Sequence, residues 1–295
     1  MTDTFDDAAR SQLIQVRSGA VTLVGERWSA EGDSRGDVLL LHGGAQRRHS
    51  WRRTAERLAR QGWTAHAFDA RGHGDSSWAA DGDYSMEASV GDLVAIAATL
   101  ESRPVLVGAS MGGMTSLLAV GGNPELARAL VMVDIVARPN LSGTSRIRDF
   151  MASAPNGFAS LEEAADAISA YNPHRPRPAS LEGLKKNLRL FEDGRWHWHW
   201  DPSMLIGMQS RSADRMMADD ENPLILAARK VTIPTLLVRG GDSDVVSEAG
   251  FREMQELIPQ ARAVQVPQAG HMIAGDDNDV FTAELGTFLS ELPAE

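Results

Sequence analysis

The sequence predicts an α/β fold, in which an eight-stranded, mostly parallel sheet is flanked by helices and carries an inserted, mainly helical cap. Three observations predict it. Short apolar runs, typical of strands buried on both faces, alternate with helix-like stretches over most of the 295 residues. Two strand-like runs joined by Ser18-Gly19 precede this alternation, and one long interruption lies between Ile135 and Thr235.

The first two strand-like segments, Leu13–Arg17 and Ala20–Trp28, flank Ser18-Gly19 and are predicted to form an antiparallel hairpin. Strand and helix patterns then alternate, which predicts parallel strands joined by helical crossovers. The further strands are expected at Val38–Leu41, Thr64–Phe68, Val105–Val107, Ala129–Ile135, Thr235–Arg239 and Ala263–Val266, with helices near Ser50–Arg60, Met86–Leu100 and Met114–Val120.

The interruption between the sixth and seventh strands is far longer than the usual connection of about 2 to 6 residues. We interpret residues 137–216 as a cap inserted into a core domain made of residues 1–136 and 217–295. The first half of the cap, Ser145–Ala170, has helix-compatible residues. A group of prolines at positions 173 to 178 predicts a bend before a second helix near Leu181–Leu190.

A strict Trp/His alternation within the cap follows the turn signal Asp193-Gly194 and runs through Trp200. Period two predicts an extended segment, with the tryptophans on one face and His197 and His199 on the other. The aromatic face either packs on the cap helices, which we favour, or lines a pocket. Because no cysteine or H-E-x-x-H pattern accompanies the two histidines, we assign no metal site.

Composition narrows the class of protein. A content of 43% hydrophobic and 23% charged residues fits a globular protein with a substantial core, and the absence of cysteine excludes disulfides and cysteine nucleophiles. The net charge of −11 disfavours nonspecific binding to nucleic acid or anionic membranes. With no signal-like N-terminus and no apolar stretch of about 20 residues, a cytoplasmic protein is expected.

Four arginines lie close together, against this acidic background, at positions 47, 48, 52 and 53. A solvated helix face is the ordinary explanation for such a cluster. The alternative is an electropositive rim that attracts an acidic group of a substrate.

The segment Gly108–Gly113 carries the pattern G-x-S-x-G between a strand-like run and a helix-like stretch. This context predicts a nucleophile elbow, a sharp turn that exposes the serine hydroxyl at the carboxyl edge of the sheet. Glycines two residues before and after Ser110 permit that turn, because a side chain there would collide with the backbone. A glycine-rich loop is the plainer alternative, so the neighbouring segments matter.

Two of these segments strengthen the prediction of an elbow. The strand Val38–Leu41 ends in the loop His42–Ala45, and Ala269–His271 follows the last predicted strand. Together with the stretch Asp69–Ser76, these segments resemble the α/β-hydrolase superfamily, specifically a serine hydrolase with a helical cap from its esterase and cofactor-free haloperoxidase-like group. The resemblance covers nearly the whole chain and implies an α/β-hydrolase fold whose cap forms the roof of the substrate pocket.

The resemblance also implies a catalytic triad. Ser110 is the expected nucleophile and His271 the expected base, whereas His42 and His73 fall in structural stretches of the family. For the acid we favour Asp244, which follows the seventh strand, over Asp134 at the end of the sixth. Asp242 comes too early in the same loop as Asp244.

The family's oxyanion hole maps onto the backbone N–H groups of Met111 and Gly44, with Ala45 as a substitute for Gly44. The helix that follows the elbow adds the positive end of its dipole. The side chains of Met111 and Met114 are expected to line the acyl pocket.

The expected activity is therefore acyl transfer, because relatives that open epoxides or displace halides place aspartate at the elbow. The expected substrate is a small-molecule ester, lactone or thioester, cleaved without a cofactor by a monomer or homodimer. The alternatives are a haloperoxidase or perhydrolase, a carbon–carbon bond hydrolase, and a ligand receptor that turns over slowly. A scaffolding role would leave the ordered set of catalytic residues unexplained.

Overall fold

The structure, a computed structural model, describes residues 11–171, 181–205, 221–271, 273 and 279–293. It contains an eight-stranded sheet in the order β1-β2-β4-β3-β5-β6-β9-β10. The first two strands form an antiparallel hairpin, β2 pairs antiparallel with β4, and all later pairs are parallel, which confirms the predicted fold class. The strands are β1 (Ser11–Ser18), β2 (Val21–Trp28), β3 (Asp37–Leu41), β4 (Thr64–Phe68), β5 (Val105–Ala109), β6 (Ala129–Val133), β9 (Thr235–Gly240) and β10 (Arg262–Val266).

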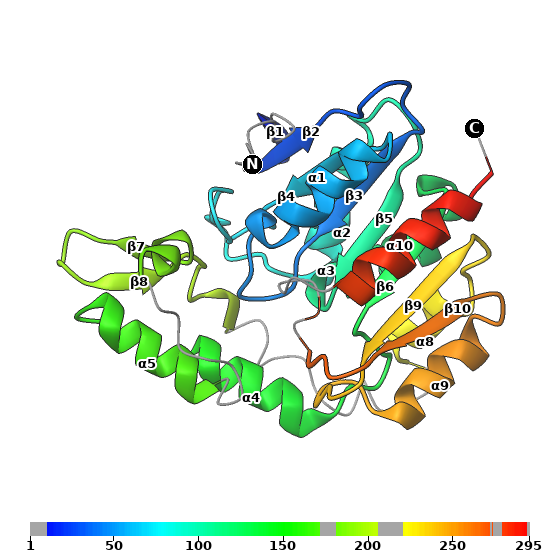
Figure 1. The fold of residues 1–295 in the computed structure, drawn as a ribbon. Helices are drawn as coiled ribbons and strands as arrows, with labels where there is room; N and C mark the ends of the chain where they lie inside the picture. Colours follow the sequence, from blue (N-terminus) through cyan, green and yellow to red (C-terminus); the bar gives the residue numbers. More distant parts are fainter. Residues whose placement is uncertain (1–10, 172–180, 206–220, 272, 274–278, 294–295) are drawn as a thin grey trace, which may run out of the picture.

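Helices cover both faces of this sheet (Figure 1). Along β5, Val105 and Val107 pack in the cluster that contains the apolar residues of α1 and α10, while Leu106 packs with those of α2, α3 and α8. A continuous apolar run is thus buried on two sides, as parallel strands require. The core helices are η1 (Arg48–Trp51), α1 (Arg52–Arg60), α2 (Met86–Ala97), α3 (Met111–Gly122), η2 (Pro124–Leu126), α8 (Pro223–Ala228), α9 (Glu248–Leu257) and α10 (Asp279–Glu291). No described helix has the length and apolar character of a membrane span.

The segment between β6 and α8 lies beside this α/β core, in green in Figure 1. It comprises α4 (Leu141–Met151), α5 (Leu161–Tyr171), η3 (Glu182–Lys186) and the hairpin of β7 (Leu188–Leu190) with β8 (Trp196–Trp198). The helices fall in the first half, where the sequence predicts them. The domain boundaries stay a prediction, because residue 216 and the proline-rich bend lie outside the described residues.

The predicted second cap helix near Leu181–Leu190 is wrong. A short 3-10 helix occupies its first part, and its last residues form β7. The extended tryptophan segment explains the difference, because its backbone N–H and C=O groups need a partner strand. Pairing Leu188 with Trp198 provides one and buries both side chains.

The tryptophans form the apolar centre of the cap. Trp198 stacks on Trp200 with ring centroids 4.6 Å apart, and Phe158 meets the same ring edge-on at 5.1 Å. The strand itself ends at Trp198, so the two histidines diverge in their contacts. His197 binds Asp193 in the hairpin turn, whereas His199 is fully buried and accepts a hydrogen bond from Gly74 in the core.

Candidate active site

Ser110 lies at the turn between β5 and α3, with φ 47° and ψ −114°. Glycines make this turn possible. A Cβ at Gly108 would lie 2.5 Å from the Gly112 carbonyl oxygen, and one at Gly112 would lie 2.4 Å from the Leu41 carbonyl oxygen. The Ser110 N–H donates to the Val133 carbonyl of the neighbouring strand, and the Ser110 carbonyl accepts from the Met114 N–H of α3, so hydrogen bonds on both sides hold the unfavourable backbone conformation.

A row of three side chains meets at this turn. His271 Nε2 is 3.1 Å from Ser110 Oγ, and His271 Nδ1 is 2.7 Å from Asp134 Oδ2. Because an ionised carboxylate only accepts hydrogen bonds, Nδ1 carries the proton and the Nε2 lone pair faces the serine hydroxyl. The side chain of Asp134 is 1% exposed and that of His271 is 12% exposed. The row can therefore withdraw a proton from Ser110 at a largely water-excluded place.

Asp134 is held by further donors that the sequence did not single out. The Gly240 N–H donates to Oδ1 at 2.8 Å, and the Ser243 hydroxyl donates to Oδ2 at 2.5 Å. Asp134 has φ 52°, a left-handed conformation that aspartate tolerates better than most residues. The neighbouring order of β6 and β9 brings these groups together, because parallel strands end at a common edge.

Asp244, the acid that the sequence favoured, lies elsewhere, and that choice is wrong in this geometry. Its carboxylate makes an ion pair with Arg146 of α4 at 2.7 Å, and its side chain is 35% exposed. The reason is the tight turn after β9, in which the Ser243 N–H donates to Gly240 O and directs Ser243 toward Asp134. Helix α4 packs against the backbone of Asp244, since a Cβ at Gly143 would lie 2.4 Å from the Asp244 carbonyl oxygen.

Asp242 has a structural role in the same loop. Its N–H donates to the Ala269 carbonyl at 2.9 Å, two residues before His271. A Cβ at Gly240 would lie 2.5 Å from that carbonyl oxygen, so only glycine lets the histidine loop approach β9 so closely. These backbone contacts seat His271 beside Asp134.

The two predicted oxyanion donors flank Ser110. Met111 begins α3, and the loop after β3 passes close to the serine, because a Cβ on Gly43 would lie 3.2 Å from Ser110 Cβ. The Gly43 N–H is bonded to Gln46 Oε1, whereas the Gly44 and Met111 N–H groups make no hydrogen bond within the described part of the chain. Both groups are available to a ligand, and their role as donors stays a prediction.

A cavity of about 530 Å³ opens onto this row and reaches under the cap. Its described lining is mainly apolar, and it includes Met111 and Met114, as the sequence predicted. Trp198 and Trp200 of the cap therefore both stack on each other and line the pocket. The aromatic and sulfur-containing lining residues are Tyr84, Phe150, Tyr171, Trp198, Trp200, Met111, Met114, Met151 and Met204.

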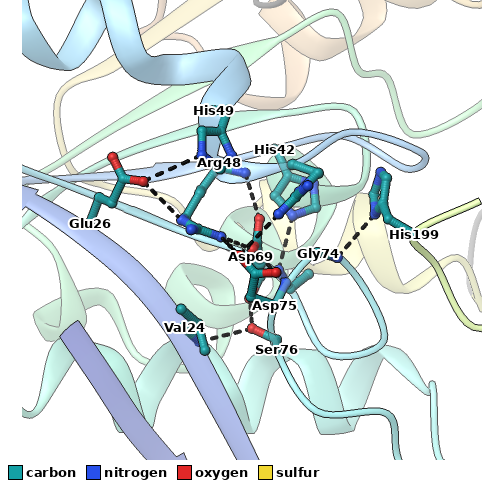
Figure 2. A network of polar contacts seen from close by, with 12 residues as sticks. Val24, Glu26, His42, Arg48, His49, Asp69, Gly74, Asp75, Ser76 and His199 are labelled. Carbon is teal, nitrogen blue, oxygen red and sulfur yellow. Dashed lines mark hydrogen bonds and ion pairs between the residues drawn. The ribbon is translucent and has the colours of Figure 1, made fainter. Parts of the chain in front are cut away.

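Two arginines near the cavity, among the residues that the structure describes, are paired with carboxylates. Arg71, which lines it, makes two hydrogen bonds to the Asp92 carboxylate at 2.6 and 2.7 Å. Arg48 is buried in ion pairs with Asp69 and Asp75, and Figure 2 shows this network beside His42.

The predicted arginine cluster therefore has two parts. Arg47 and Arg48 are buried and pair with Asp75, whose side chain is 44% exposed, an arrangement that neither a solvated face nor an electropositive rim describes. Arg52 and Arg53 are exposed on α1, and Arg52 pairs with Glu56 one turn later, as on a solvated helix face. Within the described ranges, no group of three or more metal-ligating side chains is suited to hold a metal ion.

Comparisons with known proteins agree with this geometry. A family model described as the alpha/beta hydrolase fold matches residues 37–277. The chain is 29% identical over 272 residues to the esterase Rv0045c of Mycobacterium tuberculosis, covering 90% of this chain and 85% of that protein. It is 32% identical over 255 residues to N-formylmaleamate deformylase of Pseudomonas putida, covering 85% and 88% of the two chains.

Among solved structures, an E-2-(acetamidomethylene)succinate hydrolase is similar in fold, with a TM-score of 0.80, 23% identity and coverage of 95% and 100%. A structure of the M. tuberculosis esterase Rv0045c has a TM-score of 0.72 at 26% identity, with coverage of 95% and 92%. Because the family model spans most of the chain and the elbow, the histidine loop and the parallel sheet all lie within it, this protein belongs to the α/β-hydrolase family.

Proposed function

We propose that this hydrolase is a serine esterase that forms an acyl-enzyme on Ser110. The observation that carries the proposal is the hydrogen-bonded row of Asp134, His271 and Ser110, which opens onto an apolar cavity. An esterase among the relatives supports the choice of an ester bond.

In the first step, Ser110 Oγ attacks the carbonyl carbon while His271 Nε2 takes its proton. A C–O bond forms, and the carbonyl oxygen becomes an oxyanion. Asp134, which accepts from Nδ1, fixes the tautomer of His271 and stabilises the imidazolium that results. The three donors on Asp134 keep its carboxylate in place throughout.

The oxyanion is stabilised by the N–H groups of Gly44 and Met111, each worth about 3 kcal/mol in enzymes of this kind. The positive end of the α3 dipole acts on the same atom. His271 then protonates the leaving alkoxide, and the acyl-enzyme remains. Water then attacks the acyl carbon while His271 takes its proton, the bond from that carbon to Ser110 Oγ breaks, and His271 returns the proton to Oγ as the acid leaves. The cycle uses no cofactor.

The cavity supports a neutral, apolar acyl group. Its described lining is aromatic and methionine-rich, and the guanidinium of Arg71 is already bonded to Asp92. A substrate carboxylate placed against this described lining would lose its hydration without gaining a free cation from it. A volume of about 530 Å³ suits a chain of medium length, and lactones or thioesters of the same character fit the same chemistry.

The test is steady-state hydrolysis of p-nitrophenyl esters from acetate to decanoate by the native chain and by Ser110→Ala. We expect sustained turnover by the native chain, an optimum at medium chain length, and a loss of kcat of at least about a thousandfold in Ser110→Ala. A matched pair, p-nitrophenyl hexanoate and mono-p-nitrophenyl adipate, tests the charge of the acyl group. The neutral ester should be preferred by at least about tenfold.

Turnover retained by Ser110→Ala would contradict the proposal, as would a native chain that is silent on every ester, thioester and lactone. Release of only one equivalent of p-nitrophenol per protein favours a ligand receptor that turns over slowly. Activity that appears only with hydrogen peroxide favours a perhydrolase, and cleavage of a diketone without ester turnover favours a carbon–carbon bond hydrolase.

A further inference from the structure

Three buried imidazoles extend from the cap to the loop that carries Gly44. The rings of His42 and His73 are 5.0 Å apart, and those of His73 and His199 are 6.0 Å apart. His199 belongs to the cap, just after β8, whereas the other two lie in core loops. All three are at most 2% exposed.

Hydrogen bonds fix the tautomer of His42. The Ala70 N–H donates to His42 Nε2 at 2.9 Å, so this nitrogen carries a lone pair. The proton of the neutral ring is then on Nδ1, which donates to the Gly43 carbonyl at 2.8 Å. Burial lowers the pKa of His42 and keeps the ring neutral.

This bond acts on the oxyanion donor through the peptide plane. The Gly43 carbonyl and the Gly44 N–H belong to one trans peptide, in which C=O and N–H point in opposite directions. A donor that holds the carbonyl on one side therefore aims the N–H to the other. The His42 carbonyl itself accepts from the Gly112 N–H at 3.2 Å, which ties this loop to the helix of the nucleophile elbow.

The cap is connected to His42 through the loop of residues 70–74. His199 Nδ1 accepts from the Gly74 N–H at 3.0 Å, a contact that Figure 2 shows. The His73 N–H donates to the Ala70 carbonyl, and the Ala70 N–H donates to His42. Cap residue Arg189 also binds this loop at the Gly74 carbonyl, and it binds the next residue, Asp75.

We propose that His42 is a positioning residue for the oxyanion donor Gly44. We also propose that His199 of the cap holds the His42 ring in position through the loop of residues 70–74. The inference rests on the proposed function, since it concerns the oxyanion of that reaction. It makes transition-state stabilisation depend on the seating of the cap. Neither histidine touches the substrate.

The experiment compares isosteric pairs in the full-length chain. At position 42, Asn retains a donor near Nδ1 and Gln retains only an acceptor near Nε2. At position 199, Asn retains the acceptor near Nδ1 and Phe retains only the ring volume. His197→Asn, in the hairpin and outside the cavity lining, is the matched control.

We expect His42→Gln to lower kcat by about ten- to a hundredfold with little change in KM, and His42→Asn to recover most of that loss. His199→Phe should lower kcat about three- to tenfold, His199→Asn less than about twofold, and His197→Asn not at all. The inhibition constant of a trifluoromethyl ketone analogue should rise in parallel with the loss of kcat/KM. A purely structural role would lower the amount of active enzyme and leave kcat per active site and this constant unchanged.

Several results would overturn the inference while leaving the esterase intact: native kcat in both His42→Gln and His199→Phe, losses explained by the unfolded fraction, or equal losses in the Asn and Phe variants at position 199. If His42→Gln does not fold, the pair at position 199 decides. Nitrogen NMR of the imidazoles provides a readout without substrate, in which a protonated Nε2 on His42 contradicts the inference. A native chain without ester turnover contradicts the proposed function instead.

Discussion

Asp134 and Asp244 follow neighbouring parallel strands, yet their surroundings differ sharply. Asp134 is buried and accepts from His271, Ser243 and the Gly240 N–H. Asp244 is partly exposed and pairs with Arg146 of the cap. The difference teaches that a carboxylate is recruited to the histidine by the donors that surround it, and that a favourable position in a loop sequence is not sufficient.

The largest difference between the two aspartates is expected when each carboxylate is replaced by an amide. Asp134→Asn is expected to lower kcat by about 10³- to 10⁴-fold, because the amide no longer holds the productive tautomer of His271. Asp244→Asn, the matched control, should change kcat by less than about threefold. The measurement is kcat for p-nitrophenyl butyrate, and a larger loss in Asp244→Asn would return the catalytic role to that residue.

Acid titration of stability should extend the contrast between buried and exposed polar groups. Burial lowers the pKa of His42, that of His199 well below the ordinary 6.5, and that of His73 to about 3. Below pH 6.5 these histidines bind protons in the unfolded chain and stay neutral in the folded chain, so the free energy of unfolding decreases as pH falls. For His73 the expected loss is about 1.4 kcal/mol per pH unit between pH 6.5 and about pH 3, and His42 and His199 add to it in the same direction.

Urea unfolding between pH 7.5 and 4.5 measures this slope. The stability of a His73→Asn variant should be less sensitive to acid than that of the native chain, because asparagine does not bind a proton in the unfolded state. An identical slope in the two proteins would show that His73 does not carry the pH dependence.

Removal of a single donor should sharpen the account of Asp134. Ser243→Ala deletes the hydroxyl that binds its Oδ2, and we expect kcat to fall about fivefold, equivalent to about 1 kcal/mol. Ser243→Thr, which keeps the hydroxyl, is the control. If the alanine variant loses stability alone, with kcat unchanged, Ser243 serves the turn and not the carboxylate.

The smallest effect is expected at the other acid. A double-mutant cycle with Arg146→Ala and Asp244→Ala should give a coupling free energy of about 0.2 to 1 kcal/mol, because the pair is partly exposed and screened by water. Thermal unfolding measures it at low and high salt. A coupling free energy of several kcal/mol that is the same at low and high salt would mean that the Arg146–Asp244 pair behaves as a buried ion pair.

Local sequence patterns located most of the fold and two of the three side chains in the row of Ser110, His271 and Asp134. The strands follow from apolar runs, the elbow from glycines that a side chain could not replace, and His271 from its place after the last strand. The second cap helix was wrong because a three-residue strand gains its stability from its partner, which local propensity does not contain.

The sequence by itself determined the fold class and the places of Ser110 and His271, because each depends on short-range backbone geometry and on the order of strands. Only the tertiary structure decided which aspartate meets His271, because that choice depends on the turn after β9 and on where α4 packs. It likewise decided that His199 of the cap contacts a core loop 125 residues away in the chain. Contacts of this kind are set by burial and packing between distant segments, and no local pattern records them.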